Sequence, residues 1–408
     1  MIRSRAALTA IASGFVVTLA QLAIAILLLA PEGPLGWRYQ TLIEHDSYWF
    51  GDIVNRGYAT TVPPAPHKMI EVSNTAFFPA YPAAAALLHY GLGFTTENAM
   101  LLAAQLAAWG FWTYFFLLCA RWQIGAAPRY FGALLIAAHP AAFYLIAAYS
   151  ESLFLMSLLG FLYWMNAGTR GGKILAALHG IVMTGTRIVG LPCALAPIAQ
   201  RLWERGWRGI KQTRSWMRNY AGPILLSASA MIGGLAFFLF CQLRWGRWDI
   251  YMLTQESGWA IDPDYLAVFK FESYRLSLPS LDNPTEASQL AVTIGALMFI
   301  VVGIAEFLPA IRRQTTRSVR VAIYFAAWVL FYISVSGVAC VAMESMLRYE
   351  FCVHALLVLA FLHYLHNVPV RSRLVRASAV MAAVLISAVG LALECWYVWN
   401  FTRGNWVA

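Results

Sequence analysis

The sequence predicts an all-α integral membrane protein that crosses a bilayer many times. Of its 408 residues, 60% are hydrophobic and only 12% are charged, and the mean hydropathy is +0.62. Soluble globular domains carry roughly twice that share of charged residues. The apolar residues are also gathered into runs of about 20, the length that crosses the hydrocarbon core of a bilayer as a helix.

The first apolar run extends from about Ala7 to Ala30 and follows Arg3 and Arg5. It is too long for the core of a cleaved signal peptide, so we expect a retained first span. Basic residues beside a span favour the cytoplasmic side, which places the N-terminus there. Further spans are expected at approximately 98–120, 130–148, 150–167, 174–200, 221–243, 288–310, 321–341, 347–366 and 377–397.

The run 174–200 is long for one span and short for two, and Gly185-Thr186-Arg187 interrupts it. If it forms a hairpin of two short helices with its tip at Arg187 on the outer side, the chain has eleven spans. The cytoplasmic segments then hold 19 of the 29 basic residues and, among the acids, only Glu204 and Glu306. The positive-inside rule favours this topology.

A rival topology makes Phe78–Gly93 a full span and 174–200 a single one, which divides the basic residues almost evenly between the two sides. In the favoured topology, Phe78–Gly93 is instead a juxtamembrane or re-entrant helix opened by Pro79 and Pro82. We therefore expect an all-α bundle of about eleven transmembrane helices with a long first outer loop.

Two long loops are expected on the outer side, residues 31–97 and residues 244–287. The second contains Trp245-Gly246-Arg247-Trp248-Asp249. Loops of this length on a rigid scaffold commonly carry function. Because no internal repeat, Gly/Ser linker or low-complexity tract is visible, we expect residues 1–408 to form a single transmembrane domain.

The cysteine content and the net charge exclude two other classes of protein. The cysteines lie within or at the edges of apolar runs, without a CxxC motif, which argues against a disulfide framework and a zinc site. The net charge of +10 is concentrated in the segments expected on the cytoplasmic side, so we expect no nucleic-acid partner. The cysteines are Cys119, Cys193, Cys241, Cys340, Cys352 and Cys395.

Two carboxylates lie just beyond the first span. The motif reads His45-Asp46-Ser47-Tyr48-Trp49-Phe50-Gly51-Asp52 and continues to Arg56-Gly57-Tyr58. Asp52 has Arg56 four residues further on, so a structural ion pair is the favoured interpretation. Asp46 has no basic residue at three or four positions on either side, which makes it the better candidate for chemistry.

Further ionisable residues are expected at the same face, namely Glu151 in Tyr149-Ser150-Glu151-Ser152, Arg187, and Arg348 in Met346-Leu347-Arg348-Tyr349. Charges at a membrane boundary are costly unless they are paired or solvated in a cavity. One interpretation is a polar cleft that binds a phosphate-bearing lipid. The other is structural ion pairing, as Glu151–Arg187 or Glu344–Arg348, and the sequence leaves both open.

These motifs resemble those of the PIG-V-like mannosyltransferases, which belong to the GT-C superfamily of membrane glycosyltransferases. The opening motif through Gly57-Tyr58 is similar to that family's Trp-Asp-Ser signature, with His45 in place of the tryptophan. The other similar segments follow in order along nearly the whole chain. They are Ala76-Phe77-Phe78-Pro79-Ala80-Tyr81-Pro82, Tyr149-Ser150-Glu151-Ser152-Leu153-Phe154, Thr186-Arg187, Trp245-Gly246, Leu347-Arg348-Tyr349 and Asn405-Trp406-Val407.

The resemblance implies an inverting glycosyltransferase that takes a hexose, mannose in this family, from a polyprenyl-phosphate donor. The acceptor is a lipid or glycan at the non-cytoplasmic face. An inverting transfer needs a base for the acceptor hydroxyl, and the family's activating carboxylate lies in the first outer loop, which makes Asp46 the candidate. Because arginine binds phosphate oxygens at two points, the candidates for the donor phosphate are Arg187 and Arg348, followed by Arg247 and His45.

The remaining candidates would contact substrate. Aromatic side chains can stack on a sugar face, but they are also typical of an interfacial belt, and both interpretations stand. The candidates for substrate binding are Asp52, Tyr48, Trp49, Tyr58, Tyr81 and Glu151. The carboxylates of Asp46, Asp52 and Glu151 could hold Mg²⁺ or Mn²⁺, but the sequence has no DxD motif, so we assign no metal.

Two other classes of function are kept as alternatives. A lipid-linked saccharide flippase or a secondary transporter would also need intramembrane charges, but transporters tend to show two broken helices, and only one break, at 185–190, is visible. An O-antigen ligase or polymerase would centre on a large late outer loop. We expect a monomer in a bacterial inner membrane, with its site on the periplasmic side.

Overall fold

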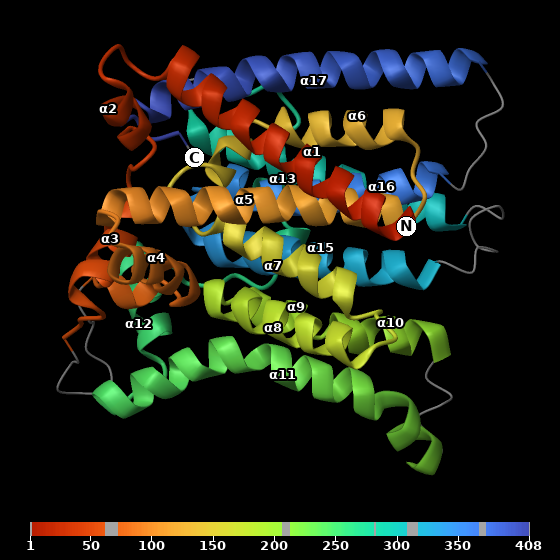
Figure 1. Ribbon diagram of the computed structural model, residues 1–408, viewed down its shortest axis with the longest axis horizontal. Coiled ribbons are helices and arrows are strands. Elements are labelled where there is room, and N and C mark those ends of the chain that lie inside the picture. The colour runs from red at the N-terminus through yellow and green to blue at the C-terminus, as the bar shows by residue number, and fades with distance from the viewer. Residues whose placement is uncertain are drawn as a thin grey trace.

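The computed structural model describes residues 2–61, 72–205, 213–280, 283–307, 317–366 and 373–407. Within these residues the structure is helical and contains no strand. The helices lie roughly side by side along the long axis of the molecule, with α17 at one edge and α11 at the other (Figure 1). The all-α class predicted from the composition is confirmed.

Among the described residues, seven helices are long and apolar enough to cross a membrane, which makes this a multi-pass membrane protein. Their hydropathy comes from uninterrupted apolar runs, and charged residues lie mainly at their ends. They are α1 (Ile2–Ala23) with its continuation η1 (Ile24–Leu29), α5 (Thr96–Arg121), α11 (Thr213–Trp245), α13 (Pro284–Phe307), α15 (Arg317–Val338), α16 (Met346–His366) and α17 (Arg373–Phe401).

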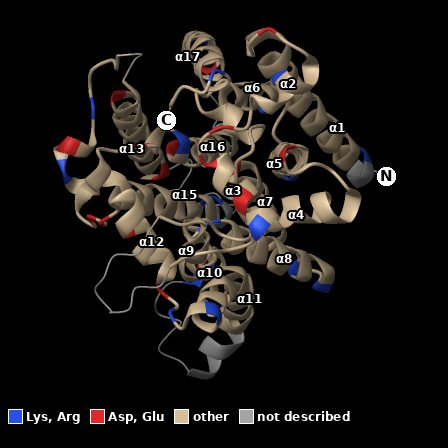
Figure 2. Ribbon diagram, turned by 90° about the vertical axis from the view of Figure 1, so that its left-hand side faces the viewer, with Lys and Arg blue, Asp and Glu red and all other residues tan. Residues whose placement is uncertain are grey.

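Several shorter helices lie between the long ones or cover one end of the bundle. Those within the bundle are α6 (Ala126–Ala137), α7 (Glu151–Trp164), α8 (Arg170–Thr186), α9 (Gly190–Cys193) and α10 (Ala196–Arg205). Those at one end, called here the α3 end, are α2 (Leu35–Gln40), α3 (Ser47–Arg56), α4 (Ala80–Leu92) and α12 (Ile250–Trp259) (Figures 1 and 2). Short turns of other helix types are η2 (Asn74–Ala76), η3 (Ala142–Leu145), η5 (Ala267–Phe269), η6 (Phe271–Ser273) and η7 (Ala339–Val341).

The run 174–200 reverses direction at Arg187, as the hairpin topology predicts. Arg187 directly follows α8, and its Nη1 donates to Glu151 at the start of α7. On the returning helix α10, Gln200 exchanges hydrogen bonds with Asn166, just beyond the other end of α7. The two arms of the hairpin therefore run in opposite directions along α7.

About eleven spans were predicted, two of them short, whereas among the described residues seven helices satisfy the length and composition of a span. The predicted span 130–148 is α-helical only as far as Ala137, and the 3₁₀ turn η3 follows within it. Pro140 explains the early end, because a proline lacks a backbone N–H and disfavours helix in the residue before it. The segment Phe78–Gly93 forms the 13-residue helix α4, too short for a span, which agrees with the predicted juxtamembrane helix.

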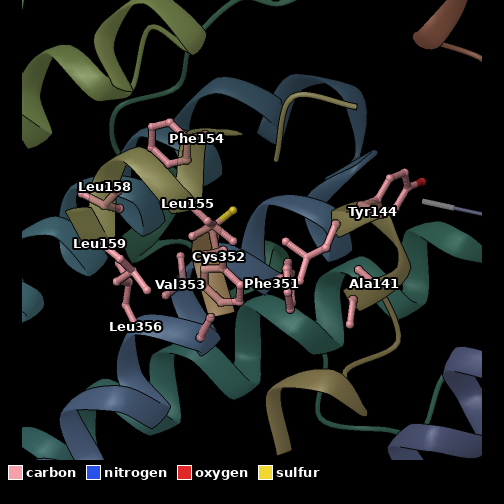
Figure 3. Close-up of a cluster of buried hydrophobic side chains, with 14 of the residues drawn as sticks. Ala141, Tyr144, Phe154, Leu155, Leu158, Leu159, Phe351, Cys352, Val353 and Leu356 are labelled. Carbon is pink, nitrogen blue, oxygen red and sulfur yellow. The ribbon is translucent and has the colours of Figure 1, made fainter. Parts of the chain in front are cut away.

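A buried apolar cluster lies within the bundle towards the α3 end. Side chains from α7 meet side chains from the first half of α16, and Ala141 and Tyr144 lie beside them (Figure 3). The α7 residues include Phe154, Leu155, Leu158 and Leu159, and the α16 residues include Phe351, Cys352, Val353 and Leu356. This packing fixes the first turns of both helices, where Glu151 and Arg348 lie.

Two glycines allow α8 and α11 to pack backbone against backbone. A Cβ atom on Gly233 of α11 would lie 1.9 Å from the carbonyl oxygen of Ile181, and one on Gly180 would lie 2.3 Å from the Cβ of Ala230. Small residues at such crossings are typical of helices that associate within membranes.

We predict that Gly233→Ala lowers the stability of the protein, whereas Gly222→Ala in the same helix does not. The new methyl group at position 233 would force α8 and α11 apart at a cost of about 1–3 kcal/mol. No atom lies within 4 Å of a Cβ at Gly222. Thermal unfolding in detergent measures both variants, and equal midpoints would contradict the packing described here.

Candidate active site

A cavity of about 900 Å³ lies at the α3 end, where the segments that follow α2, α6, α8 and α15 come together. Figure 2 looks onto this end of the molecule. Its wall includes His45, Asp46, Trp49, Phe77, Tyr149, Glu151, Arg187, Tyr251, Gln255, Glu256, Trp259, Asp262, Tyr265, Glu344, Arg348, Tyr349 and Trp406. A volume of this size suits a small polar molecule or the head group of a larger one.

Four charged side chains form an ion network in the wall of the cavity. Arg348 donates from Nη1 to Oδ2 of Asp46 at 2.7 Å, and its Nε lies 3.3 Å from Oε1 of Glu151. Arg187 donates from Nη1 to the same Glu151 oxygen at 2.9 Å. Two acids and two bases thus balance in charge, and Glu151 joins the two arginines.

The four side chains of the network differ in the fraction of their surface that is exposed. The side chain of Glu151 is 1% exposed and that of Arg348 is 7% exposed, whereas Arg187 and Asp46 are 17% and 19% exposed. Glu151 therefore lies behind the arginines, and Arg187 and Asp46 are the members most open to the cavity. Since a buried charge is costly when unpaired, each arginine is held in place by the carboxylates beside it.

Tyrosine rings surround the two guanidinium groups. The ring of Tyr349 lies 4.8 Å from the guanidinium carbon of Arg187 and 5.1 Å from that of Arg348, whose Nη2 donates to the Tyr349 hydroxyl. Tyr149 lies 5.2 Å from the Arg348 guanidinium carbon on another side. The negative faces of aromatic rings attract such cations.

Local structure explains how each charged residue reaches the network. Asp46 occupies the N-cap position of α3, yet its side chain makes no capping hydrogen bond and turns to Arg348 instead. Arg187 is extended, with φ −151° and ψ 145°, because the chain reverses there. Glu151 and Arg348 lie in the first turns of α7 and α16, and a helix N-terminus favours the carboxylate of Glu151.

His45 holds the C-terminal segment against the opening motif. Its Nε2 lies 3.2 Å from the carbonyl oxygen of Asn405, and since a carbonyl only accepts, Nε2 carries the proton. Its ring packs on Trp406 at 4.9 Å and on Phe401 at 5.9 Å. The backbone at His45 is left-handed, with φ 52°, which is uncommon for a residue other than glycine. His45 lines the cavity, but its Nε2 is engaged by the main chain.

Asp46 has no basic residue at helical spacing, yet the structure gives it an ionic partner. Its partner Arg348 lies 302 residues away in the sequence, so a search for bases at helical spacing could not detect it. The expected pair of Asp52 with Arg56 is confirmed, and Asp52 also accepts from Asn74 at 2.8 Å. Asp52 does not line the cavity, in contrast to its predicted place in substrate binding.

Of the four aromatic candidates, Trp49 alone lines the cavity, where it packs on Phe77 and Trp259. The other three make hydrogen bonds outside the cavity, which the motif did not indicate. Tyr48 is 61% exposed and bonds Glu44, the Tyr58 hydroxyl donates to the carbonyl of Phe77, and the fully buried Tyr81 donates to the carbonyl of Met100.

Arg247 also lies outside the cavity wall, although it was a candidate for the donor phosphate. It forms a two-point ion pair with Asp249, at 2.7 Å for Nη2 to Oδ2 and 3.0 Å for Nε to Oδ1. The hydrogen bonds from Arg247 hold the pKa of Asp249 below its usual value. The sequence suggested two structural ion pairs, Glu151–Arg187 and Glu344–Arg348. The first is present, whereas Arg348 pairs with Asp46 and Glu151.

Sequence reasoning missed the contribution of α12 to the cavity wall. Tyr251, Gln255 and Trp259 line it from successive turns of this helix. Their spacing of four residues is typical of one helix face, so a helix assigned within 244–287 would have indicated it. No group of three or more His, Cys, Asp or Glu side chains is arranged to hold a metal ion within the described ranges.

Comparison with known proteins finds a distant structural likeness. No family model matches the chain, and no curated protein matches it. The oligosaccharyltransferase of Archaeoglobus fulgidus in its apo form has a TM-score of 0.48 and 13% sequence identity, over 98% of this chain and 56% of that one. The oligosaccharyltransferase AglB of the same organism, in complex with an inhibitory peptide and a dolichol-phosphate, has a TM-score of 0.46 at the same identity and coverage. This chain spans about half the length of these structures.

We predict that Glu151→Gln destabilises the protein strongly, because it leaves two partly buried arginines with one carboxylate between them. Removing one partner of a buried ion pair typically costs about 3–5 kcal/mol. Glu204→Gln is the control, since Glu204 pairs with Arg201 where both side chains are about one-third exposed, and such surface pairs contribute little. Thermal unfolding midpoints in detergent decide the matter, and similar small losses in both variants would refute the structural role of Glu151.

Proposed function

We propose that the protein is an inverting glycosyltransferase of the GT-C type, which moves a hexose from a polyprenyl-phosphate donor to a lipid or glycan acceptor. Mannose is the sugar that the PIG-V-like resemblance suggests. The observation that carries the proposal is the ion network of Asp46, Arg348, Glu151 and Arg187 in the wall of a cavity within a membrane protein. The same residues stand in the motifs that resemble the family.

Arg187 and Arg348 suit a lipid phosphate. They are joined through one Glu151 oxygen, both line the cavity, and guanidinium groups present fixed N–H donors that match phosphate oxygens. When the bond from the sugar to the phosphate breaks, negative charge grows on the phosphate. Cations already held in position by neighbouring groups stabilise that charge without rearrangement.

Asp46 would act as the base after an exchange of partners. In the structure its Oδ2 accepts from Arg348, so it is engaged before substrate binds. An incoming phosphate competes for that guanidinium and releases Asp46. The acceptor hydroxyl then attacks the anomeric carbon, its proton passes to Asp46, and the sugar–phosphate bonding electrons leave with the polyprenyl phosphate.

The aromatic part of the wall suits a sugar. Trp49, Trp259, Trp406 and Tyr349 line the cavity, and ring faces pack well on the apolar face of a hexose. A cavity of about 900 Å³ has room for a sugar and the phosphate that carries it. His45 contributes by holding Trp406 in the wall.

The orientation and the finer topology are part of the proposal. Arg121 ends α5, Arg170 begins α8 and Arg205 ends α10, all at the end opposite α3, and the positive-inside rule makes that end cytoplasmic. The α3 end then faces the periplasm of a bacterial inner membrane. The short helices α6, α7, α8 and α10 would supply the remaining passes of an eleven-pass, single-domain monomer.

We predict that Asp46→Asn abolishes sugar transfer, with turnover lower by about 10²–10⁴-fold, because the amide cannot take the acceptor proton. The assay offers the purified protein in vesicles a radiolabelled polyprenyl-phosphate mannose and a lipid acceptor, and it measures released polyprenyl phosphate. Asp52→Asn is the matched control from the same loop and should retain turnover.

Normal turnover in Asp46→Asn would remove Asp46 from the mechanism. A transporter would instead move intact lipid across the vesicle membrane without releasing polyprenyl phosphate, so the same assay separates the two classes of function.

We also predict that Arg187→Ala reduces turnover by at least about 10²-fold, the usual effect of losing one charge-stabilising donor. Arg247→Ala removes an arginine that lies outside the cavity and should keep near-normal turnover. Unfolding midpoints must be compared first, because Arg187 also pairs with Glu151. If both variants keep their turnover, Arg187 does not bind the donor phosphate.

A further inference from the structure

The segment that joins α12 to α13 exposes an unusual number of large apolar side chains. Within residues 265–278, Leu278 is 87% exposed, Phe269 is 76%, Leu276 is 74% and Phe271 is 73%. Tyr265 and Leu266 are exposed to a similar degree. A run of large exposed apolar side chains of this kind is unfavourable in water and usually marks a contact with a partner or a membrane.

The path of this segment along α13 indicates how deep it lies. The Glu272 carbonyl accepts from Gln289, the Arg275 N–H donates to the hydroxyl of Thr293, and the Ser280 N–H then donates to the carboxylate of Glu286. At 1.5 Å per residue, Thr293 lies roughly 10 Å further along the helix axis than Glu286. The segment therefore descends beside α13 and returns.

At the position along α13 that this segment reaches, the exposed surface of the helix is apolar. Directly after Thr293, a stripe of exposed residues at helical spacing begins, consisting of Ile294, Leu297, Val301 and Ile304. Within the described part of the chain, α13 is one of seven helices that qualify as spans, and an apolar stripe exposed on a span is expected to face lipid. The part of segment 265–278 that lies furthest along α13 is therefore beside the start of this stripe.

Ion pairs reduce the cost of bringing the charged residues of this segment to that level. Lys270 pairs with Asp264 at 2.5 Å, and Arg275 pairs with Glu286 at 2.9 Å. Paired charges with long apolar stems are tolerated at the membrane interface, where their heads reach towards water.

We propose that residues 265–278 form a re-entrant edge that lies in the bilayer and contacts the acyl chains of the leaflet at the α3 end. Asp262, Pro263 and Tyr265 line the cavity, so this edge adjoins the cavity wall. A lipid could place its head group in the cavity while its chain stays in the bilayer along the edge. That last step rests on the function proposed above, whereas the acyl-chain contact does not.

The test measures the surroundings of a nitroxide label at Leu278→Cys and, separately, at Phe269→Cys. The background carries Cys340→Ser and Cys395→Ser, since the other four cysteines are buried. The protein is held in phospholipid nanodiscs, and power saturation reports the access of oxygen and of a water-soluble nickel chelate to each label. Leu297→Cys on α13 is the lipid control, and Glu32→Cys, an exposed position in the first loop, is the water control.

We expect both labels to match the Leu297→Cys label, with high access for oxygen and at least about 10-fold less access for nickel than the Glu32→Cys label. Nickel access equal to that of the Glu32→Cys label would show a loop in water and overturn the proposal. Low access for both reagents would show a covering protein, either a partner or a second copy, and would also overturn it. The result is independent of sugar transfer, so failure of the proposed function can be told apart from failure of this one.

Discussion

Arg348 is the residue on which the arrangement of the site depends. Its guanidinium contacts Asp46 in the first loop and Glu151 at the start of α7, while its backbone begins α16. Glu151 in turn holds Arg187 at the tip of the hairpin. Because these charges are largely removed from water, none of the four segments can move away without leaving a charge uncompensated. The network therefore specifies how the loop, the hairpin and two helices dock.

The need to pair these buried charges also accounts for the short helices around the cavity. α8 ends at Thr186 and α7 begins at Glu151, so both leave irregular backbone where full-length spans would have continued helix. Irregular backbone at membrane depth is tolerated where it is buried in protein or lines a cavity. The cavity and its charged wall occupy the space that further turns of these helices would fill.

Contacts between residues close in the sequence could be predicted, and so could the gathering of the four charged residues at one face, whereas the pairings between distant segments could not. The pair of Asp52 with Arg56 follows from a spacing of four residues in a helix, and the break at Arg187 follows from the interrupted apolar run. The partner of Asp46 and the contact of His45 with Asn405 join segments from opposite ends of the chain. No periodic pattern records such pairings, since they arise when helices pack.

The sequence by itself determined that the chain is an all-α membrane protein, because apolar runs of span length leave no other stable arrangement in a bilayer. The positive-inside rule favoured a reversal within 174–200, and the structure places it at Arg187. Only the tertiary structure decided that Asp46 pairs with Arg348 in the wall of the cavity, and that the segment 265–278 descends beside α13. The reason is physical, since hydropathy and helical spacing are local properties, whereas the pairing of buried charges depends on which distant segments share the same low-dielectric space.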